Sequence, residues 1–113
     1  NTRIFLEKPN ELFHFSGSEK TQSFLKKSSI SDFNFIVRND WQYSIQHLET
    51  KKLKQILLNH SHSFIFSLSD ETKIEFQNQA IQLKMFHCVY FNDEAIDLEL
   101  NGIVYVIQLS KKI

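Results

Sequence analysis

The sequence has few of the residues that usually mark turns and crosslinks. Its 113 residues include two glycines, one proline and one cysteine. A single cysteine excludes an intramolecular disulfide, which argues against the small disulfide-stabilised folds of secreted proteins. Gly17 and Gly102 stand far apart, so the sequence has no glycine-rich loop to cradle a phosphate. Turns must therefore rest largely on asparagine, aspartate and serine.

Net charge and long apolar runs are also missing. Thirteen basic and thirteen acidic side chains give a formal net charge of zero, which argues against nucleic-acid binding through a broad basic field. No apolar run approaches the roughly 20 residues that a membrane-spanning helix needs, and the first residues do not resemble a signal peptide. We therefore expect a cytoplasmic protein without a membrane partner.

The sequence does have enough apolar and aromatic side chains for a folded core. Hydrophobic residues make up 42% of the chain and aromatic residues 13%, with eleven phenylalanines. This composition predicts an ordered chain, because so much aromatic area can be buried. At this length we expect a single domain with one core, covering residues 1–113.

The second half of the chain predicts an antiparallel β-meander of about five strands. Apolar and polar residues alternate there with the period of a strand, at 63–69, 72–77, 80–91, 95–100 and 103–109. The long stretch 80–91 is expected to be the central strand. In the first stretch, Phe64 and Phe66 are expected to face inward. Asn101-Gly102 strongly favours a two-residue hairpin turn.

The first half of the chain predicts a hairpin region and one main helix. Short strands are expected at 4–6 and 12–15, a short helix at 19–27, and a hairpin at 32–45 that turns at Asn39-Asp40. An amphipathic helix is expected over about 48–60, because four residues share one helical face: Leu53, Ile56, Leu57 and His60. The predicted class is α+β, with this helix packed on the sheet and covering the last strand, which is apolar on both faces.

Three histidines are the only candidates for a metal site. His60 and His62 are two residues apart, and His87 from another strand would complete a set of three ligands. No partner that would orient their rings is evident. We instead expect His60 on the helix, His62 in a loop and His87 in an apolar strand face, and we predict neither a metal nor a cofactor.

The sequence contains no convincing catalytic group. His87 and Cys88 are neighbours, but consecutive side chains in a strand point to opposite faces and cannot form a dyad. Cys88 is expected to be a buried structural thiol. No Gly-x-Ser-x-Gly nucleophile motif is present. We therefore predict that the protein is not an enzyme.

Two groups of charged residues are candidate binding surfaces. The first is acidic and would attract a basic protein partner; it consists of Asp93, Glu94, Asp97 and Glu99, the last two on one strand face. The second would bind single-stranded nucleic acid by stacking and phosphate contacts; it consists of Lys51, Lys52, Lys54, Trp41 and Tyr43.

These observations favour a non-enzymatic protein-binding module. Its most specific form is a small microbial or phage immunity or inhibitor protein that binds a basic partner through the acidic strand face. The alternatives are a nucleic-acid-binding domain that uses the lysine-rich helix and the front hairpin, or an accessory domain of a larger assembly. The sequence does not determine the oligomeric state.

Overall fold

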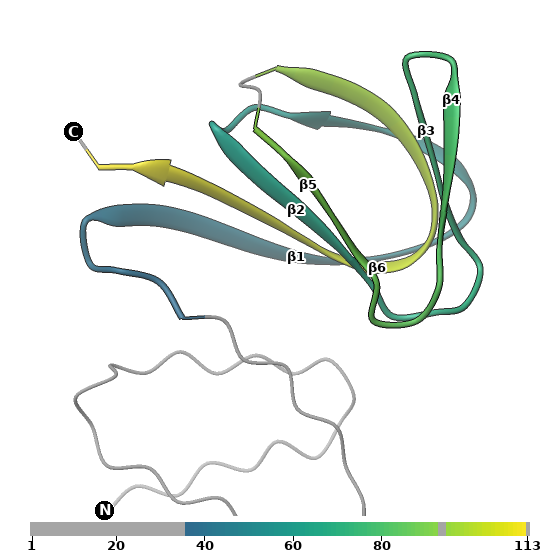
Figure 1. Cartoon of the computed structure of the whole chain (residues 1–113), viewed down its shortest axis with the longest axis horizontal. Coiled ribbons are helices and arrows are strands. Elements are labelled where there is room, and N and C mark those ends of the chain that lie inside the picture. The colour runs from purple at the N-terminus through teal and green to yellow at the C-terminus, as the bar shows by residue number, and fades with distance from the viewer. Residues whose placement is uncertain (1–35, 93–94, 113) are drawn as a thin grey trace, which may run out of the picture. The chain divides into compact units, whose positions relative to one another are not determined.

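The computed structural model describes residues 36–92 and 95–112 (Figure 1). The chain divides into two compact units after Val37, and the β-structure belongs to the unit Arg38–Ile113. The expected strands at 4–6 and 12–15, the expected helix at 19–27 and residues 32–35 of the expected hairpin lie outside the described residues. The expectation of a single domain over 1–113 stays a prediction.

All regular structure in the described residues is β-structure, so the predicted α+β class is wrong. Six strands form one antiparallel sheet in the order β4-β3-β6-β2-β5, and β1 also pairs with β6. The strands are β1 (Trp41–Leu58), β2 (His62–Ser67), β3 (Thr72–Phe76), β4 (Gln79–Leu83), β5 (Cys88–Phe91) and β6 (Ile96–Lys111).

Strand β6 is the centre of the sheet. One of its edges pairs with β1, from Trp41 opposite Lys111 to Leu58 opposite Ile96. Its other edge pairs first with β3, at residues 99–101, and then with β2, at residues 104–109. Figure 1 shows β6 curving as it passes from one partner to the next, which curls the sheet.

The expected central strand at 80–91 does not exist as one strand. Its residues form β4 and β5, which lie at the two ends of the strand order. A turn at 84–87 separates them, with Phe86 in the left-handed region at φ +68°. Residues 84–87 include no glycine or proline that would mark the break.

The expected helix at 48–60 is also wrong, because residues 41–58 form β1. Between Thr50 and Lys54 the pairing of β1 with β6 shifts its register, and the residues there are exposed. Leu53 and Leu57 are exposed while Leu58 is buried. The apparent helical stripe therefore joined side chains from both faces of an irregular strand.

Gly102 lies within β6, so the turn predicted at Asn101-Gly102 is wrong. Its φ of +144° and its close approach to Thr72 both require glycine. The Gly102 amide donates a hydrogen bond to Thr50 Oγ1 at 3.2 Å, and that hydroxyl donates to the Leu100 carbonyl at 3.2 Å. Glycine thus allows β6 to stay paired where the sheet curves.

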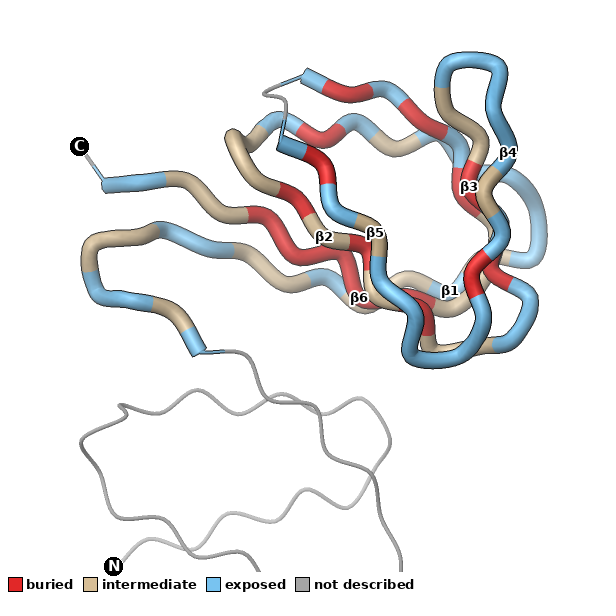
Figure 2. The backbone as a smooth tube through the Cα atoms, viewed as in Figure 1, coloured by how far each residue is buried: buried red, intermediate tan, exposed pale blue. Residues whose placement is uncertain are grey.

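The core lies on one face of the curled sheet, which we call the inner face. Buried and exposed positions alternate along several strands (Figure 2), most regularly at the start of β6. Ile96, Leu98 and Leu100 are buried as predicted. The core cluster consists of Leu58, Ile65, Ile74, Leu83, Phe91, Ile96, Leu98, Leu100, Val104 and Val106.

The face of β2 that packs into the core is the opposite of the predicted one. Its fully buried residues are Ser63, Ile65 and Ser67, whereas Phe64 and Phe66 are only partly buried. Small side chains suit the inner side of a curled sheet, where neighbouring residues crowd. The larger phenylalanines fit on the outer face.

The sequence predicted that a helix would cover the second face of the last strand. No helix in the described residues does so. Aromatic side chains from neighbouring strands lie there instead. His47 of β1 packs edge-on against Tyr105 of β6 at 5.7 Å, and Phe66 of β2 is directly opposite Tyr105.

Candidate ligand-binding hollow

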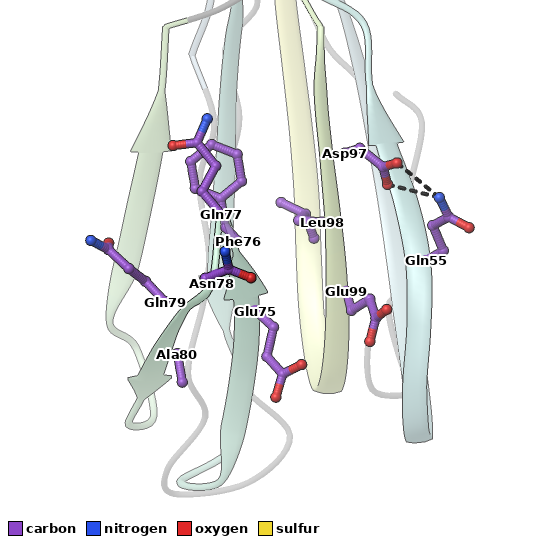
Figure 3. A pocket seen from close by; sticks show the side chains of 10 residues that line it. All are labelled: Gln55, Glu75, Phe76, Gln77, Asn78, Gln79, Ala80, Asp97, Leu98 and Glu99. Carbon is purple, nitrogen blue, oxygen red and sulfur yellow. Dashed lines mark hydrogen bonds between the residues drawn. The ribbon is translucent and has the colours of Figure 1, made fainter.

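A hollow of about 500 Å³ lies where the end of β3 diverges from the start of β6 (Figure 3). Strand β6 pairs with β3 only at residues 99–101, so the two strands separate beyond that point. The hollow is lined mainly by carboxylates and carboxamides, from Gln55, Glu75, Phe76, Gln77, Asn78, Gln79, Ala80, Asp97, Leu98 and Glu99.

Two carboxylates face each other across neighbouring strands of this hollow. Glu75 of β3 is the direct partner of Glu99 of β6 in the strand register. Like charges in directly opposite positions of a sheet are unfavourable. Lys73 forms an ion pair with Glu75 at 3.2 Å, but both side chains are well exposed and such pairs contribute little. The Glu99 carboxylate has no ion-pair or hydrogen-bond partner among residues 36–92 and 95–112.

The third carboxylate is held in place from β1. The Gln55 amide nitrogen donates to both carboxylate oxygens of Asp97, each at 2.9 Å (Figure 3). Gln55 is also the direct neighbour of Glu99 in the pairing of β1 with β6. One glutamine therefore lies beside two of the three acidic side chains.

The rim of the hollow is the tight turn between β3 and β4. Its central residues, Gln77 and Asn78, have φ values of +49° and +62°. Two consecutive left-handed residues are the conformation of a two-residue type I′ hairpin turn. Asparagine tolerates this conformation readily, whereas glutamine does so less often. The turn adds two carboxamides to the lining.

Sequence comparison places the chain in a family. The family described as HutD matches residues 1–107. This chain belongs to the HutD family. No curated protein matches it.

A solved HutD structure has the same fold as this HutD-family chain. It is described as "Structure of HutD from Pseudomonas fluorescens SBW25 (Formate condition)", and the two sequences are 16% identical with a TM-score of 0.51. The likeness covers 65% of this chain and 38% of that one. The chain thus spans well under half of the length of that HutD structure.

Two other solved structures are similar at a lower level. A de novo designed double-stranded β-helix is 9% identical, with 60% of this chain and 97% of that one covered and a TM-score of 0.45. A protein containing a cupin-2 domain from Shewanella frigidimarina NCIMB 400 is 12% identical, with coverages of 68% and 76% and a TM-score of 0.46.

Membership of the HutD family corrects the functional predictions. The prediction of an immunity or inhibitor protein that binds a basic partner is wrong. The two alternative predictions, a nucleic-acid-binding domain and an accessory domain, gain no support. The expectations that the chain has a protein partner, lacks enzymatic activity and is cytoplasmic stay predictions. None of the described residues forms a helix long and apolar enough to cross a membrane.

The predicted acidic surface is brought together in part. Asp97 and Glu99 share one exposed face of β6, as expected, and both line the hollow. Asp93 and Glu94 lie outside the described residues. Sequence reasoning missed Glu75 and Gln55 as neighbours of this pair, because strand order was unknown and Gln55 was assigned to a helix.

The predicted nucleic-acid surface is not assembled. Trp41 and Tyr43 lie at the start of β1, whereas Lys51, Lys52 and Lys54 lie in its irregular middle. At about 3.3 Å per residue, Tyr43 and Lys51 are about 25 Å apart along the strand. The missing helix is the reason, because it would have gathered the lysines on one face.

The three histidines lie in different settings. His60 is in the turn after β1, with Nδ1 at 2.9 Å from Asn59 Oδ1 and at 3.1 Å from Gln108 Oε1. His62 is in β2 and hydrogen-bonded to the Tyr90 hydroxyl. His87 is exposed in the turn at 84–87 rather than buried in a strand face. Among residues 36–92 and 95–112, no group of three or more acidic, histidine or cysteine side chains is placed to hold a metal ion.

Cys88 is exposed, so its prediction as a buried thiol is wrong. It begins the short strand β5 at one end of the sheet and points to the outer face, beside Phe66. Partial desolvation by its neighbours still raises the pKa of the Cys88 thiol. The thiolate is therefore less populated at neutral pH than it is in a free cysteine.

Proposed function

We propose that this chain is a ligand-binding β-domain of the HutD family, and that its hollow binds a small organic cation such as an amine or a guanidine. A volume of about 500 Å³ lies within the range of small-molecule sites. In this proposal the domain binds its ligand and does not transform it.

The observation that carries the proposal is the register of Glu75 and Glu99. The sheet places these two residues directly opposite each other, and within the described residues only Glu75 of the two forms an ion pair. A ligand cation between them would turn this repulsion into two attractive contacts.

Other lining residues suit the rest of such a ligand. Asp97 is fixed by Gln55 and offers a third carboxylate. The carboxamides of Gln77 and Asn78 offer both donors and acceptors at the rim. Phe76 and Leu98 add apolar contact for a carbon chain. This lining favours a short molecule with a cationic head and a polar end.

The proposal is tested by calorimetric titration with agmatine and arginine as cations, and with formate as an anion. Formate is the ion in the description of the Pseudomonas structure. We expect the cations to bind, with affinity that falls as salt is added, and formate not to bind at the hollow.

Charge-neutralising variants test whether the cation binds at the hollow. Glu99→Gln and Glu75→Gln should each weaken cation binding by roughly tenfold, which corresponds to about 1.4 kcal/mol. Glu71→Gln is the matched control, because Glu71 is exposed and lies outside the hollow. Failure of both cations to bind, or an equal loss in the Glu71 variant, would rule out this function.

A further inference from the structure

The turn at 84–87 is held firmly against the neighbouring loop. The His87 amide donates to the Lys84 carbonyl at 3.0 Å. The Phe86 amide donates to the Ser67 carbonyl at 2.7 Å, and the Ser67 amide donates to the His87 carbonyl at 2.8 Å. The Met85 amide donates to Asp70 Oδ1 at 3.2 Å. These bonds fix the direction in which the turn presents its side chains.

This turn displays two large apolar side chains to solvent. Met85 is 44% exposed and Phe86 is 55% exposed. Phe86 also has a φ of +68°, a conformation that is unfavourable for a bulky side chain and natural for glycine. Local backbone energetics therefore do not account for a phenylalanine at this position, and about half of its surface stays exposed.

Phe86 is continuous with an aromatic strip along β5. Its ring stacks on Phe66 with ring centres 6.0 Å apart, and Tyr90 stacks on Phe64 at 4.8 Å. Tyr90 is 48% exposed. We define the β5 patch as the exposed residues Met85 and Phe86 of the turn together with Cys88 and Tyr90 of β5.

The β5 patch lacks the charges that normally protect the edge of a sheet. Residues 85–92 include no lysine, arginine, aspartate or glutamate, and in the described residues β5 pairs only with β2. Natural edge strands are usually protected by charged side chains. β1, which pairs only with β6 in the same part of the chain, carries Lys51, Lys52 and Lys54. β4, at the other end of the strand order, has no charged side chain either, but its exposed residues are Gln79, Ala80 and Gln82. Among the described strands, β5 is therefore the uncharged edge with large apolar side chains exposed on it and on the turn before it.

We propose that the β5 patch binds the same patch of a second copy of this chain around a two-fold axis. An uncharged patch brings no like charges together when it meets itself. Its rim carries opposite charges, with Lys84 at the start of the turn and Asp70 beside it, so each lysine has a carboxylate available on the other copy. An apolar centre with a polar rim is the usual anatomy of a protein interface.

Sedimentation of the full 113-residue chain from micromolar to millimolar concentration tests the proposal. We expect a reversible monomer–dimer equilibrium. Phe86→Gly should weaken the dimer by roughly tenfold or more, while the melting temperature of the dilute monomer stays the same or rises because the backbone strain is relieved. Leu57→Ala is the matched control, because Leu57 is a 64% exposed residue on β1 and should leave dimerisation unchanged.

A charge pair tests the two-fold arrangement. Tyr90→Lys and Tyr90→Glu should each abolish the dimer, and an equal mixture of the two variants should restore it. Cys88 is the only cysteine, so a short bis-maleimide should link two copies through it, and Cys88→Ser should abolish the link.

Four outcomes would overturn the proposal. They are a chain that stays monomeric throughout, a dimer unaffected by Phe86→Gly, a dilute Phe86→Gly monomer that melts at a lower temperature, and a charge-pair mixture that does not associate. The third would mean that Phe86 serves the packing of its own chain.

Discussion

Gly102 lies against Thr72, so closely that a Cβ atom on Gly102 would come within 2.5 Å of Thr72 Oγ1 and 2.9 Å of the Thr72 Cα. Thr72 itself is fully buried, and its hydroxyl is hydrogen-bonded to Ser67 Oγ at 2.7 Å. Neither residue has room to move aside. This contact is where β6 passes from its β3 partner to its β2 partner.

Replacing Gly102 by alanine should therefore destabilise the protein strongly. We expect a loss of about 2–5 kcal/mol in the free energy of unfolding, from steric overlap together with an unfavourable φ. Urea denaturation followed by circular dichroism measures it. Asn101→Ala is the control, since it changes the preceding residue without the overlap. Equal stability of the Gly102 variant and the parent would contradict the contact.

Substitution of two neighbouring leucines on β1 tests whether this segment is a strand or a helix. Leu58 is fully buried and Leu57 is 64% exposed. Leu58→Ala should cost about 2–5 kcal/mol of unfolding free energy, because it leaves a cavity in the core, whereas Leu57→Ala should change it by about 0.5 kcal/mol or less. The same denaturation experiment measures both. The reverse order of effects would favour the helical stripe that includes Leu57.

Two buried serines on β2 should respond in opposite ways to loss of their hydroxyls. Ser63 Oγ has no hydrogen-bond partner in the part of the chain that the structure describes, while Ser67 Oγ is bonded to Thr72 Oγ1 and accepts from the Ser69 amide at 3.3 Å. Ser63→Ala should be neutral or stabilising, and Ser67→Ala should cost about 1–2 kcal/mol. Thermal melts of the two variants give the comparison. A greater loss for Ser63→Ala would reveal a partner for its hydroxyl.

Alternation located β-structure at 63–67, 72–76 and within β6, but it did not decide which face of a strand was buried. Ile96, Leu98 and Leu100 were placed correctly on the buried face, because the residues between them, Asp97 and Glu99, are charged. In β2 both faces carry residues that a core accepts, and side-chain size pointed to the phenylalanines. The curl of the sheet reversed that choice, because its inner side had room for Ser63 and Ser67. Curl depends on distant pairing and is not visible in a short stretch of sequence.

The largest error arose where a strand is irregular. The middle of β1 is exposed and loses its alternation between Thr50 and Lys54, and its lysines, leucines and glutamine are good helix formers. Local preference therefore favoured a helix where pairing with β6 imposes a strand.

The candidate hollow could not be predicted from the sequence for a related reason. Asp97 and Glu99 could be placed on one face, but the nearness of Glu75 depends on the pairing of β3 with β6.

The central position of β6 has a consequence for how the sheet is made. β6 is the last of the six strands in chain order, yet β1, β2 and β3 all pair with it. Pairing Trp41 with Lys111 must close a long loop, which makes folding slow compared with proteins built from local contacts. During synthesis on the ribosome, the first three strands must wait without their main partner until β6 emerges. We expect that interval to be when the nascent chain most needs protection by a chaperone.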